Sequence, residues 1–546
     1  MTALKERLDR IVPSIERICD VSGIAGLSLG IISRGQIVTT IHHGYKNIDN
    51  KAKPDDDTAY GIGSLTKGFT AATLASLVDE GAVTWDTSIK SIIPDFRTTS
   101  AEVTERLTVK DALAHRMGLT RSNQLWHGKD NHILIEKSHV IKHFTTMRNT
   151  QPFRSKMHYN NWGYALAGAV VEKLTEQDWG TAVTDRVLRP FGLSKTYTRP
   201  HESADFASPY AALDDRTCVP LEPFKVKAGT LMDSSQGLWS TVTDMLQWCS
   251  KLLRANEQQN NKQDVDNESM IQLTEIFSPQ IKISDDEKGP FYGLGWALTD
   301  LPSPMGALGC NPGLISHMPT VGKSSKERII YSQGSLAGYT ANLILVPGQD
   351  VGIAVLTNSI ALNDGADWVA QAVLEAVLDE QQPNDFVQAA TTSAQSMVDK
   401  FPQMEKRLRE SQHSDAPPKR LTEYTGVYRN DIKDFCIGIR EDGSHNALAL
   451  YFQDKDSQRW PLKHYQADEF TWLMSHDEAV RHARFPYPPE KIFKFGFESS
   501  NGQISGLWWT HDLDSEPEFF QKTSGPRDAG VGSSSVGYEP ASLTPR

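Results

Sequence analysis

Cysteines are few in this sequence, and none stands at a spacing typical of a disulfide framework or a zinc site. The five are scattered over the 546 residues, at positions 19, 218, 249, 310 and 436, which favours free thiols in a reducing compartment. The charged, amphipathic first residues lack the apolar core of a secretion signal, and no apolar run is long enough to cross a membrane. We therefore expect a cytoplasmic protein without a membrane partner.

Positive charge is scarce as well. The 56 lysines and arginines are outnumbered by 68 aspartates and glutamates, and the net charge of -12 argues against nucleic acid as the main partner. A composition of 39% hydrophobic and 23% charged residues is that of a globular enzyme, and the length allows more than one domain. The sequence indicates no metal and no organic cofactor, and it leaves an oligomer open.

One stretch, residues 60–70, carries the strongest chemical signal. Two glycines break the chain before a run of helix-forming residues that continues to Glu80. Ser64 lies in the first turn of this expected helix and Lys67 three residues later, so both side chains share one face. A serine hydroxyl is a poor nucleophile until a base removes its proton, and a lysine one turn away is a candidate base. The alternative is a serine N-cap beside a solvated lysine.

Two further patterns follow along the chain. Residues 159–161, Tyr-Asn-Asn, stand just before an expected helix at 165–174, although a Tyr-x-Asn pattern alone is weak evidence. Residues 332–335, Ser-Gln-Gly-Ser, break an expected strand with a glycine loop, and strands at 340–346 and 351–357 follow. Both patterns lie in the same predicted domain as Ser64.

The periodicity of the apolar residues divides the chain into four parts. We predict a catalytic domain at 1–380 and a linker or helical bridge at 381–420. From 421 to 522 the apolar period changes to two, which predicts an antiparallel, barrel-like β domain. Residues 523–546 are rich in glycine, serine and proline, so we expect a disordered tail.

The order of these motifs resembles the serine β-lactamase and penicillin-binding-protein superfamily, in particular its class C-like branch of esterases, D-aminopeptidases and acyltransferases. Residues 108–119 look like the branch's T-h-x-x-L-L-x-H-x-S-G-L segment, 159–164 like its Y-S-N-x-G-Y, and 237–244 like its G-G-L-x-S-T-x-x-D. The β domain is similar to the lipocalin-like appendage of some members. The resemblance implies an α+β fold: an antiparallel sheet flanked by helices, a helical subdomain, and a C-terminal barrel.

The same resemblance implies a role for each motif residue. Ser64 would be the acylated nucleophile, Lys67 its activating partner, and Tyr159 the group that shuttles the proton. Asn161 would orient Lys67 or the substrate, and the backbone N–H groups of Ser64 and Ser335 would form the oxyanion hole. Lysine and tyrosine have ordinary pKa values near 10, so either needs a depressed pKa to act as a base at neutral pH.

The sequence departs from the family at its third motif, which is K-T-G or H-x-G. Here Ser332 stands at the place of the cation, followed by Gln333 and Gly334. A serine hydroxyl donates a hydrogen bond but supplies no charge for a substrate carboxylate. We therefore expect Ser332, Gly334 and Ser335 to bind neutral esters, thioesters or amides.

Together these patterns predict a serine hydrolase or acyltransferase with a small-molecule acyl substrate, with secondary metabolism as one setting. They do not say whether water, an alcohol or an amine attacks the acyl-Ser64 intermediate. A D-amino-acid amidase or peptidase and a β-lactamase are alternative activities. A non-catalytic binding scaffold is a third alternative, against which the joint presence of Ser64, Lys67 and Tyr159 argues.

Overall fold

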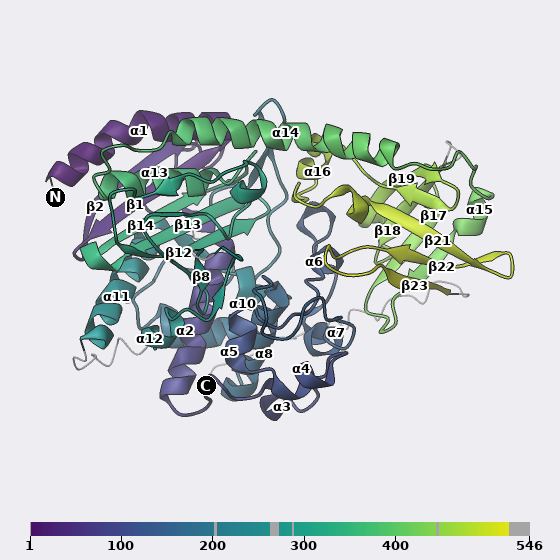
Figure 1. Ribbon diagram of the computed structural model, residues 1–546, viewed down its shortest axis with the longest axis horizontal. Coiled ribbons are helices and arrows are strands. Elements are labelled where there is room, and N and C mark those ends of the chain that lie inside the picture. Colours follow the sequence, from purple (N-terminus) through teal and green to yellow (C-terminus); the bar gives the residue numbers. More distant parts are fainter. Residues whose placement is uncertain (1, 201–204, 262–271, 287–288, 444–446, 524–546) are drawn as a thin grey trace, which may run out of the picture.

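The computed structural model describes residues 2–200, 205–261, 272–286, 289–443 and 447–523 (Figure 1). Figure 1 shows two bodies side by side, and the long helix α14 (Phe386–Glu410) runs along one edge of both. The predicted linker is therefore largely helical. The predicted disordered tail lies outside the described residues from 524 onward.

The larger body is built around an eight-stranded antiparallel sheet with the order β2-β1-β14-β13-β12-β9-β8-β7. Its strands are β1 (Gly26–Ser33), β2 (Gln36–Gly44), β7 (Ile281–Lys282), β8 (Phe291–Tyr292), β9 (Ala297–Asp300), β12 (Arg328–Leu336), β13 (Tyr339–Val346) and β14 (Val351–Thr357). Short strands outside it are β3 (Ala59–Gly61), β4 (Tyr210–Ala212), β5 (Cys218–Pro220), β6 (Trp239–Thr241), β10 (Ser303–Pro304), β11 (Thr320–Val321) and β15 (Ser359–Ile360).

Helices cover both faces of the sheet because its central strands are apolar on both sides. Along β13, Ile344 and Val346 pack in the core that holds α1 (Thr2–Ser22) and α13 (Gly365–Val377). Leu343 and Leu345 belong to the opposite core, which includes α11 (Val242–Asn260). Successive side chains of a strand point to opposite faces, so an unbroken apolar run is buried on both.

Most of the remaining helices form a subdomain below the sheet in Figure 1. They are α2 (Thr66–Asp79), α3 (Ile89–Ile92), α4 (Ala101–Arg106), α5 (Val109–Leu113), α7 (Val140–His143), α8 (Asn161–Thr175), α9 (Trp179–Val183), α10 (Asp233–Gln236) and α12 (Leu273–Ile276). Helix α6 (Asn123–Trp126) lies between the two bodies. The helix predicted at 165–174 begins four residues earlier, because the Asn160 side chain caps it by accepting the Trp162 N–H.

The smaller body is a closed barrel of eight antiparallel strands that pair in sequence order, with β16 and β23 closing the ring. The strands are β16 (Gly426–Arg429), β17 (Cys436–Glu441), β18 (Leu448–Phe452), β19 (Arg459–Gln466), β20 (Glu469–Thr471), β21 (Lys494–Ser500), β22 (Gln503–Trp509) and β23 (Glu518–Thr523), with α15 (Leu421–Tyr424) and α16 (His476–Arg481). Its core is aromatic, and the Phe452 ring lies 5.3 Å from both Trp472 and Trp509. The predicted fold class, including the barrel, is confirmed.

The barrel is docked on the helical subdomain by pairs of polar side chains. His143 at the end of α7 places Nδ1 2.8 Å from the Asp434 carboxylate, and both side chains are buried. Arg121 forms an ion pair of 2.6 Å with Asp514. Burial alone would raise the pKa of Asp434, but the hydrogen bond and charge of His143 hold it below its ordinary value.

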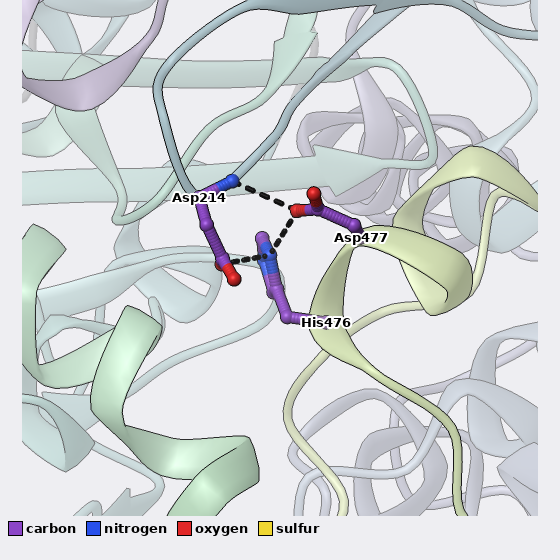
Figure 2. A group of neighbouring side chains, drawn as sticks. All are labelled: Asp214, His476 and Asp477. Atoms are coloured by element: carbon purple, nitrogen blue, oxygen red, sulfur yellow. Dashed lines mark hydrogen bonds and ion pairs between the residues drawn. The ribbon is translucent and has the colours of Figure 1, made fainter.

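A further docking contact joins the loop after β4 to the start of α16 (Figure 2). His476 Nδ1 lies 2.8 Å from Asp214 Oδ1 and 3.5 Å from Asp477 Oδ1. Asp477 also accepts a hydrogen bond of 2.8 Å from the Asp214 backbone N–H. These contacts hold the loops of the barrel against the body that carries Ser64.

Candidate active site

Ser64 lies at the junction between a strand and a helix. β3 ends at Gly61, a single 3-10 turn spans Gly63–Leu65, and α2 begins at Thr66. Ser64 forms no side-chain capping bond at the start of α2, and Lys67 is only 1% exposed. The alternative of a serine N-cap beside a solvated lysine is therefore wrong.

Two glycines let the Ser64 segment approach β12 closely. A Cβ atom on Gly63, which has a φ of 53°, would lie 2.7 Å from the Ser335 backbone nitrogen. One on Gly334 would lie 2.1 Å from the Ile62 carbonyl oxygen and 3.3 Å from the Ser64 nitrogen. No side chain fits at 2.1 Å, so these positions require glycine. The Ser64 and Ser335 backbones lie side by side as a result, an arrangement in which two N–H groups can face one oxyanion.

Lys67 is buried among neutral groups. Its Nζ atom lies 2.9 Å from Ser64 Oγ, 2.9 Å from Asn161 Oδ1 and 3.2 Å from the Ser235 carbonyl oxygen. Burial lowers the pKa of Lys67 well below its ordinary value. A neutral amine in this place can donate to Asn161 and Ser235 and accept the proton of Ser64.

Tyr159 faces Ser64 from the loop before α8. Its ring centroid lies 5.0 Å from Lys67 Nζ, and it keeps some exposure because it lines a cavity. Removal from water raises the pKa of Tyr159, and a hydrogen bond with Ser64 opposes this only in part. Tyr159 therefore holds its proton at neutral pH.

His115 packs against Tyr159 and is a site residue that we did not predict. The two ring centroids are 4.2 Å apart, and His115 Nδ1 accepts the Asn160 backbone N–H at 3.1 Å. Burial lowers the pKa of His115 well below its ordinary value, so the ring is neutral at neutral pH. The motif at 108–119 contains this histidine and was the signal available in the sequence.

The third motif is divided between the cavity and the core. Gly334 and Ser335 line the same cavity as Ser64. Ser332, in contrast, is 3% exposed and donates its hydroxyl proton to the Gly295 carbonyl oxygen at 3.2 Å. The serine that replaces the family's cation is thus occupied within the protein.

The cavity has a volume of about 370 Å³ and is lined by both bodies. The barrel side contributes the residues Arg484, Phe485, Tyr487, Pro488, Ile492, His511, Asp512 and Leu513. None of these was predicted as a site residue, because nothing in their local sequence indicates that they reach Ser64. The barrel forms one wall of the candidate active site.

Within the described ranges, one group of three side chains lies close enough together to hold a metal ion. Asp214, His476 and Asp477 offer three ligand atoms that all lie within 4.8 Å of one another. None of the three lines the cavity of Ser64, and their bonds to each other already join the two bodies (Figure 2).

No helix in the described ranges combines the length and apolar character that would let it cross a bilayer.

Known proteins resemble both parts of the chain. The sequence profile of the β-lactamase family matches residues 15–378, and that of a domain of unknown function, DUF3471, matches residues 410–524. The unguisins hydrolase ungD' of Aspergillus campestris is 25% identical over 247 residues, which are 44% of this chain and 46% of that protein. Penicillin-binding protein 4 of Amycolatopsis lactamdurans is 31% identical over 150 residues, covering 28% and 39%.

Protein flp of Staphylococcus aureus is 21% identical over 359 residues, which are 65% of this chain and 63% of flp. The chain thus spans less than two thirds of each of these relatives. The octameric penicillin-binding protein homologue from Pyrococcus abyssi shares the fold, with a TM-score of 0.55 and 18% identity over 94% of this chain and 100% of that one. A class C β-lactamase from Rhodobacter sphaeroides gives a TM-score of 0.50 and 17% identity over 73% and 99%.

Proposed function

The chain belongs to the β-lactamase family, whose profile matches residues 15–378, and from this we propose that it is a serine hydrolase or acyltransferase that forms an acyl-Ser64 intermediate. The observation that carries the proposal is the 2.9 Å approach of Lys67 Nζ to Ser64 Oγ in a buried, neutral surrounding. A neutral amine at this distance is a general base ready to activate the hydroxyl.

The proposed reaction has two halves. Lys67 takes the proton of Ser64 while Oγ forms a bond to the substrate's acyl carbon, and the N–H groups of Ser64 and Ser335 stabilise the oxyanion. The bond from the acyl carbon to the leaving group then breaks, and Tyr159 gives its proton to the leaving group and recovers one from Lys67. In the second half, water, an alcohol or an amine attacks the acyl-enzyme by the same route in reverse.

We propose that the substrate is neutral where it lies against the third motif. Ser332 carries no charge, and its hydroxyl is donated to Gly295, so this side of the site has no anchor for a carboxylate. Esters, thioesters and amides fit better than β-lactams or D-alanyl peptides for that reason. The cytoplasmic location stays a prediction, supported by five free cysteines.

The test compares the wild type with Ser64→Ala by intact-protein mass after exposure to p-nitrophenyl esters and to nitrocefin. We expect an acyl adduct with the esters that depends on Ser64, and little reaction with nitrocefin. Turnover of nitrocefin would contradict the proposed neutral substrate. Absence of every adduct would favour the non-catalytic scaffold.

The pH dependence should report on Lys67. Only the deprotonated amine can accept the Ser64 proton, and burial lowers the pKa of Lys67. We therefore expect kcat/KM for a p-nitrophenyl ester to rise with pH and to level off well below the ordinary pKa of lysine. A rise that continues up to the ordinary value, or a fall over the same range, would contradict Lys67 as the base.

A further inference from the structure

Arg484 is a buried cation in the wall of the active-site cavity. It follows α16 in the barrel, is 7% exposed and lines the cavity together with Ser64. Its guanidinium donates to the His127 carbonyl oxygen and to Gln124 Oε1, and it lies 5.8 Å from the Trp472 ring centroid. Both acceptors are uncharged.

The other charged groups of the cavity have partners of their own. Arg121 is paired with Asp514. The Asp512 carboxylate accepts the backbone N–H groups of Arg121 and Ser122. Neither carboxylate contacts Arg484, so the charge of Arg121 is compensated and that of Arg484 is not.

Asp364, the remaining carboxyl group of the cavity, does not compensate Arg484 either. Burial, together with neighbouring Asp367, raises the pKa of Asp364, which favours its uncharged acid. Burial lowers the pKa of Arg484 only to about 10, so the guanidinium stays charged at neutral pH. In the part of the chain that the structure describes, no carboxylate forms an ion pair with Arg484.

A buried charge without a counter-ion is costly, and an ionisable group that is desolvated in the wall of a cleft is a candidate for a functional site. A guanidinium is planar and presents paired N–H groups that match both oxygens of a carboxylate. The two bonds to neutral acceptors use only some of the N–H groups of Arg484, and the cavity lies beside the guanidinium. A substrate bound in the cavity can therefore supply the counter-ion.

We propose that Arg484 is a specificity residue that the barrel supplies to the active site, where it binds a carboxylate carried by the substrate. This inference rests on the proposed acylation of Ser64 and narrows its substrate class. The substrate is neutral at the third motif, and its carboxylate lies toward the barrel. The cation that the third motif lacks is thus present on a different wall of the cavity.

A purely structural role for Arg484 would have a different consequence. Its bonds to Gln124 and His127 also hold α6 against the barrel. Losing these bonds would lower kcat/KM for all substrates alike, whatever their charge. A bound carboxylate makes the loss depend on the substrate's charge. The ratio between two matched substrates separates these roles.

The experiment uses p-nitrophenyl monoesters of succinate, glutarate, adipate and suberate, each beside the neutral ester whose free carboxylate is replaced by a carboxamide. For the best chain length we expect the wild type to prefer the carboxylate by about 10–100-fold in kcat/KM. Arg484→Met should remove this preference, and Arg484→Lys should keep only part of it. Arg121→Met is the matched control, because Arg121 lines the same cavity but is already paired, and its ratio should stay that of the wild type.

A binding measurement keeps the two proposals distinguishable. The same ester pairs are titrated into the Ser64→Ala protein, and the dissociation constants should show the same preference and its loss with Arg484→Met. Binding preference without acylation of the wild type would refute the role of Ser64 and keep that of Arg484. Acylation without any carboxylate preference, a preference that survives Arg484→Met, or one that depends on Arg121 would overturn the inference. If Arg484→Met does not fold, as thermal unfolding would show, Arg484→Lys replaces it, and a carboxylate preference as large as that of the wild type would then overturn the inference.

Discussion

Replacing Lys67 by methionine should lower the rate of Ser64 acylation by about 10³-fold or more. The substitution keeps the length of the side chain but removes the amine that lies 2.9 Å from Ser64 Oγ, and a positioned general base contributes roughly 10²–10⁴-fold. The rate of adduct formation with a p-nitrophenyl ester, followed by intact-protein mass, measures the effect.

The control for this variant is Lys156→Met. Lys156 is exposed, pairs with Asp285 on the surface and belongs to the segment just before Tyr159, so acylation should be unchanged. Thermal unfolding of Lys67→Met shows whether the protein is folded, since Asn161 and the Ser235 carbonyl lose a donor. If folded Lys67→Met were acylated at the wild-type rate, Lys67 would not be the base, and Tyr159 would be the remaining candidate.

Replacing Tyr159 by phenylalanine should reduce kcat/KM by about 10²–10³-fold for an alkyl ester or an anilide. The pKa of Tyr159 is raised by its removal from water, so its hydroxyl is protonated and suited to donate to the leaving group. p-Nitrophenolate leaves without a proton, and we expect the loss for p-nitrophenyl esters to be about tenfold smaller. Steady-state kinetics with matched acyl groups on the three leaving groups tests this.

Tyr164→Phe is a suitable comparison for Tyr159→Phe. Both rings lie close to Lys67 Nζ, but the Tyr164 hydroxyl donates to the Leu113 carbonyl oxygen inside the core. Tyr164→Phe should therefore cost about 1–3 kcal/mol of stability for the unpaired carbonyl, without any dependence on the leaving group. Equal losses for all leaving groups in Tyr159→Phe would mean that Tyr159 positions the substrate and does not donate the proton.

The strongest predictions from the sequence concerned features that lie within a single element or a single pair of neighbouring strands. Ser64 and Lys67 are three residues apart at the start of a helix, and the structure places their side chains 2.9 Å apart. The alternation of apolar residues after 420 predicted the antiparallel strands of the barrel. Helical and strand periods are properties of the backbone, so they can be read from local sequence.

The function of the Tyr159 segment and of the third motif was only partly visible. The position of Tyr159 before a helix was predicted, but its raised pKa depends on the burial that His115 and the rest of the fold provide. The change to Ser332 was visible and led us to expect a substrate without a carboxylate. The uncompensated charge of Arg484 changes that expectation for the barrel side of the cavity.

The tertiary structure alone decided which distant groups meet in the site. Lys67 contacts Asn161 and Ser235, which belong to other elements of the fold. Arg484 reaches the cavity only because the barrel docks on the helical subdomain, through contacts such as that of His143 with Asp434. These pairings depend on the relative placement of whole elements, which is set by the sum of many weak contacts and not by any local period. Local backbone geometry therefore brings Ser64 and Lys67 together, whereas long-range packing determines which other groups line the cavity.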